Sequence, residues 1–263
     1  MIYLKTEEEI ELMRESNRIV SMTHAEIARV IKPGISTIAI DKLADEFIRD
    51  MGAVPGFLNY DGFPNSVCIS VNDVVVHGIP DDTVLEDGDI VSVDIGAVKN
   101  GFNGDSCFTF EVGNVDVKVK HLLQVTRESL YKGIEMAVHG NRIGDIGNAV
   151  QKHAEKHGYG VVRELVGHGI GKNLHEEPEV PNFGRKGTGP KLQQGMCIAI
   201  EPMITMGKRF IRQEKNGWTI RTIDHKPAAH FEHTIAITKV KVDILSDFSI
   251  IDKAVEQNKI NNK

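Results

Sequence analysis

The 263-residue chain contains only three cysteines and one tryptophan. The cysteines, Cys68, Cys107 and Cys197, form no C-x-x-C pair, which excludes a disulfide framework and a zinc ribbon. Basic residues are not in excess: the net charge of −6 and the pI near 6.0 argue against direct nucleic-acid binding. No apolar run approaches the roughly 20 residues that a transmembrane helix needs, and the N-terminus lacks the features of a signal peptide. We therefore expect a cytoplasmic protein with no membrane contact, in which the cysteines are small buried side chains.

The apolar pattern repeats one order of elements, helix, helix, strands, in the two halves of the chain. Thr6 and Glu9 form a capping box that opens a helix running to Ile31, and Ser36 caps a second helix that ends at Gly52. The second half predicts helices over 117–138 and 145–157. From Gly52 to Asp94 is 42 residues and from Gly158 to Glu201 is 43, which favours an internal duplication over two unrelated helical hairpins.

Two ten-residue segments, 85–94 and 192–201, share a leucine, two polar residues, a glycine and a strand that ends on an acid, Asp94 or Glu201. A second acid precedes a later strand in each half, Asp105 in the first and Glu232 in the second. Four acids delivered by apolar strands to one place require cations there, because unpaired buried carboxylates could not stay ionised.

The hairpin that carries Asp94 and Asp105 turns near Asn100-Gly101, a strong hairpin signal between strands over 89–98 and 102–112. If the turn is centred between Lys99 and Asn100, the two carboxylates face each other directly. If it is centred on Asn100-Gly101, they are diagonal neighbours on the same face. Either arrangement brings their Cβ atoms within roughly 5 to 8 Å, which is destabilising unless a cation joins them.

A glycine-rich segment over 166–171 surrounds His168, and His175 follows seven residues later. It contains neither a P-loop nor a G-x-G-x-x-G fingerprint, so the histidine rather than a phosphate cradle is the candidate active element. The resulting ligand set is Asp94, Asp105, His168, Glu201 and Glu232. Four carboxylates balance two divalent cations, and oxygen-rich ligation with one imidazole suits Mn, Fe, Co or Zn. Two such ions can polarise a carbonyl and supply a hydroxide, which indicates hydrolysis.

These motifs resemble those of type I methionine aminopeptidases of peptidase family M24. The matching segments are 76–80 (VHGIP), 93–96 (VDIG), 104–106 (GDS), 167–171 (GHGIG), 175–178 (HEEP), 200–203 (IEPM) and 231–234 (FEHT), and the resemblance covers nearly all of residues 1–245. It implies an α+β pita-bread fold with a central antiparallel sheet and pseudo-twofold halves. We expect one catalytic domain over 1–250, with pseudo-repeats at about 6–113 and 117–245, and a polar C-terminal tail over 251–263 that frays from Asp252.

The resemblance also implies an activity: metal-dependent removal of the initiator methionine from nascent proteins with a small second residue, by a monomer that works at the ribosome. The four acids and the histidine named above would hold two divalent ions. Glu201 would also act as general base, His175 would stabilise the tetrahedral intermediate, and His77 would contact the substrate backbone. The methionine side chain would lie among Tyr60, Phe63, Cys68, Leu174 and Trp218, with Phe57 nearby as ordinary core.

The chain departs from the family's usual residues at four positions, and these leave the pocket shape and substrate breadth open. They are Phe57, Phe63, Leu174 and His230. Two alternatives remain. A proline-specific metallopeptidase of the same fold would usually carry an additional N-terminal domain, for which the helix starting after Thr6 leaves no room. A non-catalytic binding protein of the same fold would typically have lost metal ligands, whereas all five are present.

Overall fold

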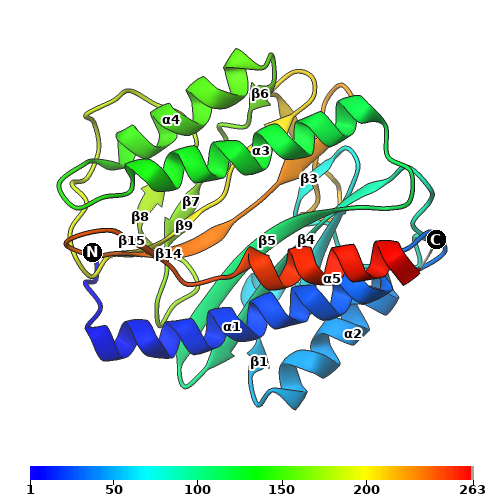
Figure 1. The fold of residues 1–263 in the computed structure, drawn as a ribbon, viewed down its shortest axis with the longest axis horizontal. Helices are drawn as coiled ribbons and strands as arrows, with labels where there is room; N and C mark the ends of the chain where they lie inside the picture. The colour runs from blue at the N-terminus through cyan, green and yellow to red at the C-terminus, as the bar shows by residue number, and fades with distance from the viewer. Residues whose placement is uncertain (262–263) are drawn as a thin grey trace.

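The computed structural model describes residues 1–261, and its helices lie in two groups on either side of the strands (Figure 1). The helices are α1 (Glu7–Val30), α2 (Thr37–Asp50), α3 (Val117–Met136), α4 (Ile143–Lys156) and α5 (Phe248–Asn261). The strands are β1 (Val54–Pro55), β2 (Val67–Val71), β3 (Val74–Val76), β4 (Ile90–Lys99), β5 (Phe102–Glu111), β6 (Gly160–Val161), β7 (Gly167–Gly169), β8 (Glu176–Val180), β9 (Cys197–Ile200), β10 (Met203–Thr205), β11 (Ile211–Gln213), β12 (Ile220–Thr222), β13 (Ala228–His230), β14 (His233–Ile237) and β15 (Val242–Ile244). No helix among these residues is long and apolar enough to cross a membrane.

Local sequence determines where the first helices begin. Thr6 Oγ1 accepts a hydrogen bond from the backbone N–H of Glu9 at 3.2 Å, and the Glu9 side chain accepts from Thr6 N at 3.0 Å. This is the predicted capping box, and it satisfies N–H groups that have no partner within the helix. The Ser36 side chain caps α2 in a similar way by accepting from Ala39 N. The order of elements repeats as predicted, with α1 and α2 before the first set of strands and α3 and α4 before the second.

All strand pairs in the four sheets are antiparallel. In the first half, β4 lies between β5 on one side and β2 and β1 on the other. In the second half, the order is β15-β14-β9-β7-β8. Buried aliphatic side chains from both halves, such as Ile40, Ile95, Ile198 and Ile235, form one main core. The two long strands of the first half, β4 and β5, run between the two groups of helices (Figure 1), and most of their side chains are buried.

The β4–β5 hairpin resolves the alternative that the sequence leaves open. Lys99 pairs with Phe102, so the turn is centred on Asn100 and Gly101, which have φ values of 53° and 78°. Positive φ at both central residues is the backbone of the favoured two-residue hairpin turn. Asp94 pairs with Cys107 and Asp105 pairs with Gly96, so the two acids are diagonal neighbours on one face.

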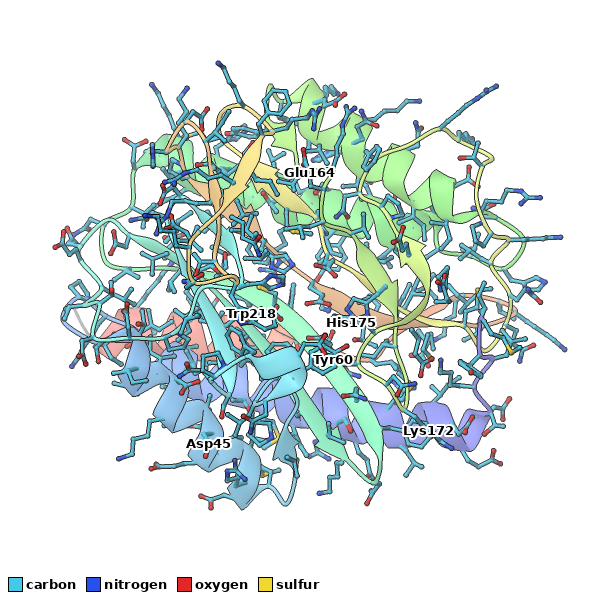
Figure 2. All side chains as sticks on the ribbon, turned by 180° about the vertical axis from the view of Figure 1, so that it is seen from behind. Asp45, Tyr60, Glu164, Lys172, His175 and Trp218 are labelled. Carbon is cyan, nitrogen blue, oxygen red and sulfur yellow. The ribbon has the colours of Figure 1, made fainter. Side chains whose placement is uncertain are left out.

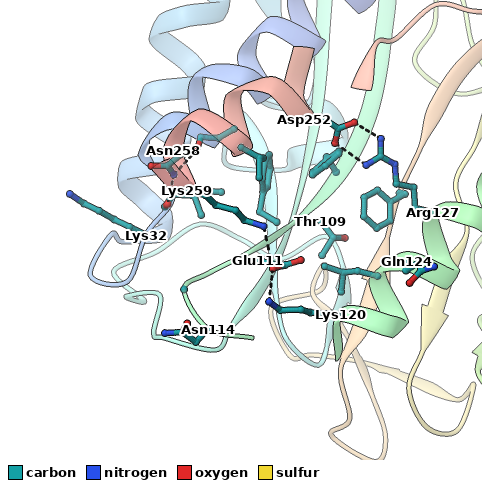
Figure 3. A pocket seen from close by; sticks show the side chains of 18 of the residues that line it. Lys32, Thr109, Glu111, Asn114, Lys120, Gln124, Arg127, Asp252, Asn258 and Lys259 are labelled. Carbon is teal, nitrogen blue, oxygen red and sulfur yellow. Dashed lines mark hydrogen bonds and ion pairs between the residues drawn. The ribbon is translucent and has the colours of Figure 1, made fainter. Parts of the chain in front are cut away.

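The expectation of a frayed C-terminal tail is wrong for residues up to Asn261, because they belong to α5. Ile251 and Ala254 are at most 1% exposed and join the main core. Asp252 accepts two hydrogen bonds from Arg127 of α3, at 2.8 and 2.6 Å, and Lys259 reaches Glu111 of β5 at 3.5 Å (Figure 3). The segment thus packs onto both halves of the molecule, and residues 262–263 lie outside the described part of the chain.

Candidate metal centre

The five predicted ligands converge from both halves of the chain on one cavity of about 140 Å³. Asp94 lies in β4, Asp105 in β5 and His168 in β7, whereas Glu201 directly follows β9 and Glu232 directly precedes β14. The other residues that line the cavity are Phe57, Tyr60, Asp61, Phe63, Cys68, His77, Leu174, His175 and Trp218. Tyr60, His175 and Trp218 lie near one another at the middle of this face (Figure 2).

Backbone contacts between the halves position Glu232 against β5. The Glu232 N–H donates to Cys107 O at 2.9 Å, and Ser106 Oγ donates to Glu232 O at 2.7 Å. Thr234 Oγ1 donates to Asp105 O at 2.8 Å. These three bonds hold the second acid of one half beside the second acid of the other, a contact that neither strand could specify alone.

The glycines around His168 let three strands approach closely rather than hold a ligand. A Cβ on Gly169 would lie 2.2 Å from Glu177 O, and a Cβ on Gly167 would lie 2.4 Å from Ala199 O. Only glycine allows β7 to fit between β8 and β9 at these separations. The His168 Nδ1–H donates to Gly169 O at 2.9 Å, which leaves Nε2 without a proton and directed at the acids.

The distances between the polar atoms suit shared cations. His168 Nε2 lies 3.7 Å from Asp105 Oδ2 and 3.7 Å from Glu201 Oε1. One ligand atom each of Asp105, His168 and Glu232 lie within 4.8 Å of one another. Neither Asp94 Oδ1 nor Asp105 Oδ1 has a hydrogen-bond partner, although both are buried. Unpartnered buried carboxylate oxygens of this kind are costly unless a cation binds them.

Burial raises the pKa values of the four acids, as expected for carboxyl groups with no positive charge beside them. It raises the pKa of Asp94 to about 7 and that of Glu201 to about 8. Burial, followed by repulsion from neighbouring carboxylates, raises the pKa of Asp105 and Glu232 well above their ordinary values. In the absence of cations the cluster would bind protons. Four carboxylates and one imidazole therefore fit two divalent cations in both charge and donor type.

His77 and His175 border the cavity on the side of its aromatic residues. His175 Nδ1 and the Tyr60 hydroxyl are hydrogen-bonded at 2.9 Å, and the ring centroids of His175 and His168 are 4.4 Å apart. His77 has a φ of 56°, and its ring centroid lies 6.2 Å from that of Trp218. Burial lowers the pKa of His175 and lowers that of His77 to about 4. Both imidazoles are therefore neutral at neutral pH and can donate or accept hydrogen bonds.

The apolar side of the cavity contains the residues that the sequence analysis assigns to substrate. The rings of Phe63 and Trp218 meet edge-to-face at 5.2 Å, and Cys68 and Leu174 are buried in the same apolar cluster. Phe57 also lines this cavity, so its interpretation as ordinary core alone is incomplete. Its ring fits because position 96 is glycine: a Cβ there would lie 2.6 Å from a ring carbon of Phe57.

His230 is a site residue that the sequence analysis noted only as a departure from the family. It is 2% exposed, and its Nε2 lies 3.5 Å from Glu201 Oε2 without a hydrogen-bond partner. No strand alternation linked it to Glu232, because His230 ends β13 and Glu232 lies between β13 and β14. Asp61 also lines the cavity, and no sequence pattern identified it.

A larger cavity lies elsewhere. This groove, of about 1220 Å³, lies between α3 and α5 over β5 (Figure 3). Among the described residues that line it there is no histidine or cysteine. Each of its acids has a partner: Glu111 pairs with Lys120 and Lys259, Asp252 with Arg127, and Glu128 with His153. The chemistry therefore belongs to the smaller cavity.

The comparisons with known proteins agree with this geometry. The sequence profile of metallopeptidase family M24 matches residues 11–239. The chain belongs to this family. This M24 chain is 51% identical over 246 residues to methionine aminopeptidase 1 of Bacillus subtilis. The alignment covers 94% of the chain and 99% of the relative. It is 43% identical over 247 residues to the Escherichia coli K12 methionine aminopeptidase, over 93% of the chain and 94% of the relative.

Solved structures confirm the predicted α+β pita-bread fold. The crystal structure of methionine aminopeptidase from Rickettsia prowazekii matches with a TM-score of 0.93 at 43% identity, over 94% of this chain and 100% of that one. The Xaa-Pro dipeptidase from Bacillus anthracis matches with a TM-score of 0.76 at 23% identity, and the match covers only 62% of that longer chain. The M24 chain is thus a metallopeptidase that uses divalent metal, and its resemblance to methionine aminopeptidases is confirmed.

Proposed function

We propose that this M24 enzyme removes the N-terminal methionine from new polypeptides with a small second residue, using two divalent cations. One observation carries the proposal: four carboxylates, of which those of Asp105 and Glu232 are buried, and His168 surround a cavity whose opposite side is apolar, and two of the carboxylate oxygens lack partners. The relatives that bear the name methionine aminopeptidase, at 43% to 51% identity over nearly the whole chain, support the same conclusion.

The cations would be held by Asp94, Asp105, His168, Glu201 and Glu232. When bound, such ions polarise a substrate carbonyl and lower the pKa of water, and Mn, Fe, Co and Zn all fit the donor set. The four negative charges then match the charge of two divalent ions, so that the acids remain ionised without the neutralising protons that burial otherwise favours.

Glu201 takes the proton from the attacking water. Its two carboxylate oxygens face different imidazoles, His168 at 3.7 Å and His230 at 3.5 Å, so the group lies between them. His175 donates to the oxyanion that develops on the scissile carbonyl, since Tyr60 already engages its Nδ1 and leaves Nε2 for the substrate. His77, neutral and beside Trp218, contacts the substrate backbone next to the scissile bond.

The methionine side chain enters the apolar side of the cavity. Phe63 and Trp218 supply ring edges and faces, with which a thioether sulfur makes favourable contacts. Cys68 and Leu174 complete the walls. An unbranched side chain suits this narrow space, whereas a branched residue at the N-terminus of the substrate would meet the rings.

Kinetics on a peptide panel test the proposal. The purified enzyme is stripped with a chelator, reloaded with Mn²⁺, Co²⁺, Fe²⁺ or Zn²⁺ in turn, and assayed on Met-Ala-Ser, Leu-Ala-Ser and an Xaa-Pro dipeptide. We expect metal-dependent release of methionine from the first peptide only. Hydrolysis of the Xaa-Pro substrate in its place would assign the chain to the proline-specific members of the fold. Metal binding without any hydrolysis would make it a binding protein.

The remaining assignments are proposals of the same kind. Action in the cytoplasm is supported by three cysteines that are all free and buried. A monomeric state and association with the ribosome stay predictions, to be tested by light scattering and by cosedimentation with ribosomes. The single catalytic domain over 1–250 also stays a prediction, and α5 crosses its proposed end.

A further inference from the structure

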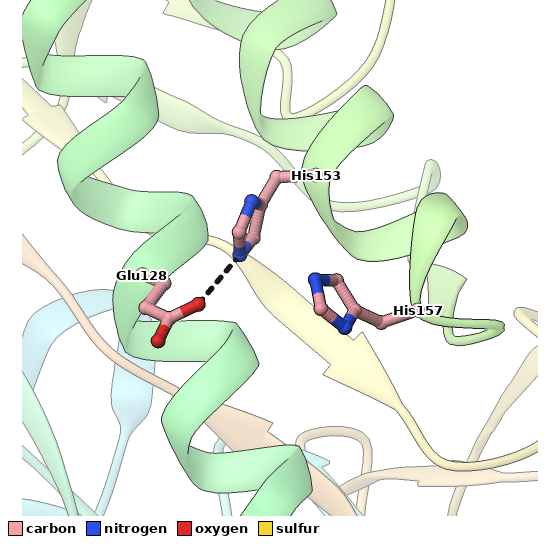
Figure 4. A group of neighbouring side chains, drawn as sticks. All are labelled: Glu128, His153 and His157. Atoms are coloured by element: carbon pink, nitrogen blue, oxygen red, sulfur yellow. Dashed lines mark hydrogen bonds and ion pairs between the residues drawn. The ribbon is translucent and has the colours of Figure 1, made fainter.

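A second cluster of metal-ligating side chains lies outside the catalytic cavity, on the surface formed by α3 and α4. Glu128 projects from α3, His153 from α4, and His157 caps the C-terminus of α4. One ligand atom of each lies within 4.8 Å of the other two. His153 Nε2 is 2.9 Å from Glu128 Oε2, and the two imidazole centroids are 4.9 Å apart (Figure 4).

The packing of the two helices fixes this arrangement. His153 and His157 are four residues apart, so they lie one above the other on one face of α4. That face meets α3 closely because position 133 is glycine: a Cβ there would lie 2.8 Å from Val150 Cγ2. The His157 backbone N–H donates to Ala154 O at 3.1 Å, and Gly158 then turns the chain away with a φ of 81°. Both imidazoles are therefore held toward Glu128 (Figure 4).

The donor set selects a class of cation. Two imidazoles and one carboxylate suit Zn²⁺ and neighbouring transition metals, whereas Mg²⁺ and Ca²⁺ prefer all-oxygen sites. Ligand atoms at roughly 2.0 to 2.2 Å from a tetrahedral ion are separated from each other by about 3 to 3.5 Å, so small side-chain rotations suffice here. The Glu128 and His153 side chains are 42% and 18% exposed, which leaves an entry path and room for water as a fourth ligand.

We propose that Glu128, His153 and His157 form a transition-metal site, with Zn²⁺ as its preferred ion, that clamps α3 to α4 and is separate from the catalytic centre. The clamp acts on the half of the fold that carries Glu201, because α3 packs against β9, β10 and β13. An ion that binds only the folded helix pair raises the stability of that half by mass action. Without the ion, His153 Nε2 and Glu128 Oε2 form a hydrogen bond at the surface.

The experiment measures how many equivalents of zinc the protein binds. The protein, with its catalytic centre intact, is titrated with Zn²⁺ against a chromophoric chelator, and its melting temperature is measured with and without the ion. We expect wild type to bind one equivalent more than His157→Ala and than the double variant His153→Ala/His157→Ala. His157 is exposed and outside the catalytic cavity, so the single variant tests the site without risk to the fold or to peptide hydrolysis.

Two controls separate this site from others. Lys152→Ala changes an exposed cation on the same helix and should keep the additional equivalent. His168→Ala should lose zinc at the catalytic centre and keep this equivalent. The affinity of the additional equivalent should fall at least 100-fold in His157→Ala, and the zinc-dependent rise in melting temperature that belongs to it should disappear. Equal zinc stoichiometry in wild type and the double variant would overturn the proposal.

Discussion

Removal of the metal should make the stability of the protein depend on pH in a direction that the buried acids define. Burial raises the pKa of Asp94 from 3.8 to about 7. A carboxyl whose pKa is higher in the folded than in the unfolded state binds its proton more tightly when folded. Its contribution to stability is therefore fully present below the unfolded value near 4 and is lost as pH rises through about 7.

The size of the effect follows from the same shift. About three units correspond to an upper bound of about 4 kcal/mol for Asp94 alone, at about 1.4 kcal/mol per unit. The acids share their protons, so the four shifts do not add. Chelated protein should therefore unfold at progressively lower urea concentration between pH 5 and pH 8, whereas Mn²⁺-loaded protein should not, because the cations take the place of the protons.

The assay is urea denaturation at pH 5, 6, 7 and 8, with chelator or with Mn²⁺. A matched variant sharpens it: Asp94→Asn removes one charge at constant shape, so without metal it should be more stable than wild type at pH 8 and inactive at every pH. If chelated wild type shows the same pH dependence as the loaded enzyme, or if chelated Asp94→Asn is the less stable protein at pH 8, the reasoning about unpaired carboxylates fails.

Three further substitutions test separate parts of the site. Glu201→Gln should retain the fold and lose nearly all turnover, by a factor on the order of 10² to 10⁴, since it removes the general base; unchanged turnover would remove Glu201 from the mechanism. His77→Ala should depress activity while both metals remain bound, as measured by metal analysis of the purified variant, and loss of the metals would mean that His77 supports the ligands instead. Gly104→Ala should destabilise the protein in thermal unfolding, because the new Cβ would lie 2.5 Å from the Asn17 backbone nitrogen of α1; an unchanged melting temperature would show that β5 can move away from the helix.

Much of the fold could be predicted because its signals are local. Thr6 and Glu9 mark the start of α1 by capping, and Asn100-Gly101 marks the β4–β5 turn by its tolerance of positive φ. The C-terminal helix was missed because its composition is polar. Its apolar residues Phe248, Ile251 and Ala254 recur at three-residue spacing and would have indicated one buried face, but the surface that covers this face, α1, is known only from the fold.

In the candidate site, too, the sequence did not predict the detailed arrangement of the residues. The sequence suggested that the two acid pairs are equivalent, yet their registers differ. Asp94 and Asp105 are diagonal neighbours within the paired strands β4 and β5, whereas Glu201 and Glu232 lie just past the last residue pair of β9 and β14, Ile200 with His233. The repeated sequence pattern therefore folds into an asymmetric cluster of four acids.

That asymmetry explains why His230 could not be assigned from the chain alone. The second pair lies past the ends of its strands, so the residue that packs against Glu201 comes from β13, which belongs to a different sheet from β9. His230 is held there by Thr109 of β5, which donates to His230 O at 2.6 Å and accepts from His230 N at 3.1 Å. The position of its imidazole beside Glu201 is thus set by contact between the halves, as is the position of Glu232 beside Asp105. If this is right, Thr109→Val should displace His230 and lower kcat while metal stoichiometry stays at the wild-type value, and a loss of metal instead would place His230 among the groups that hold the cations.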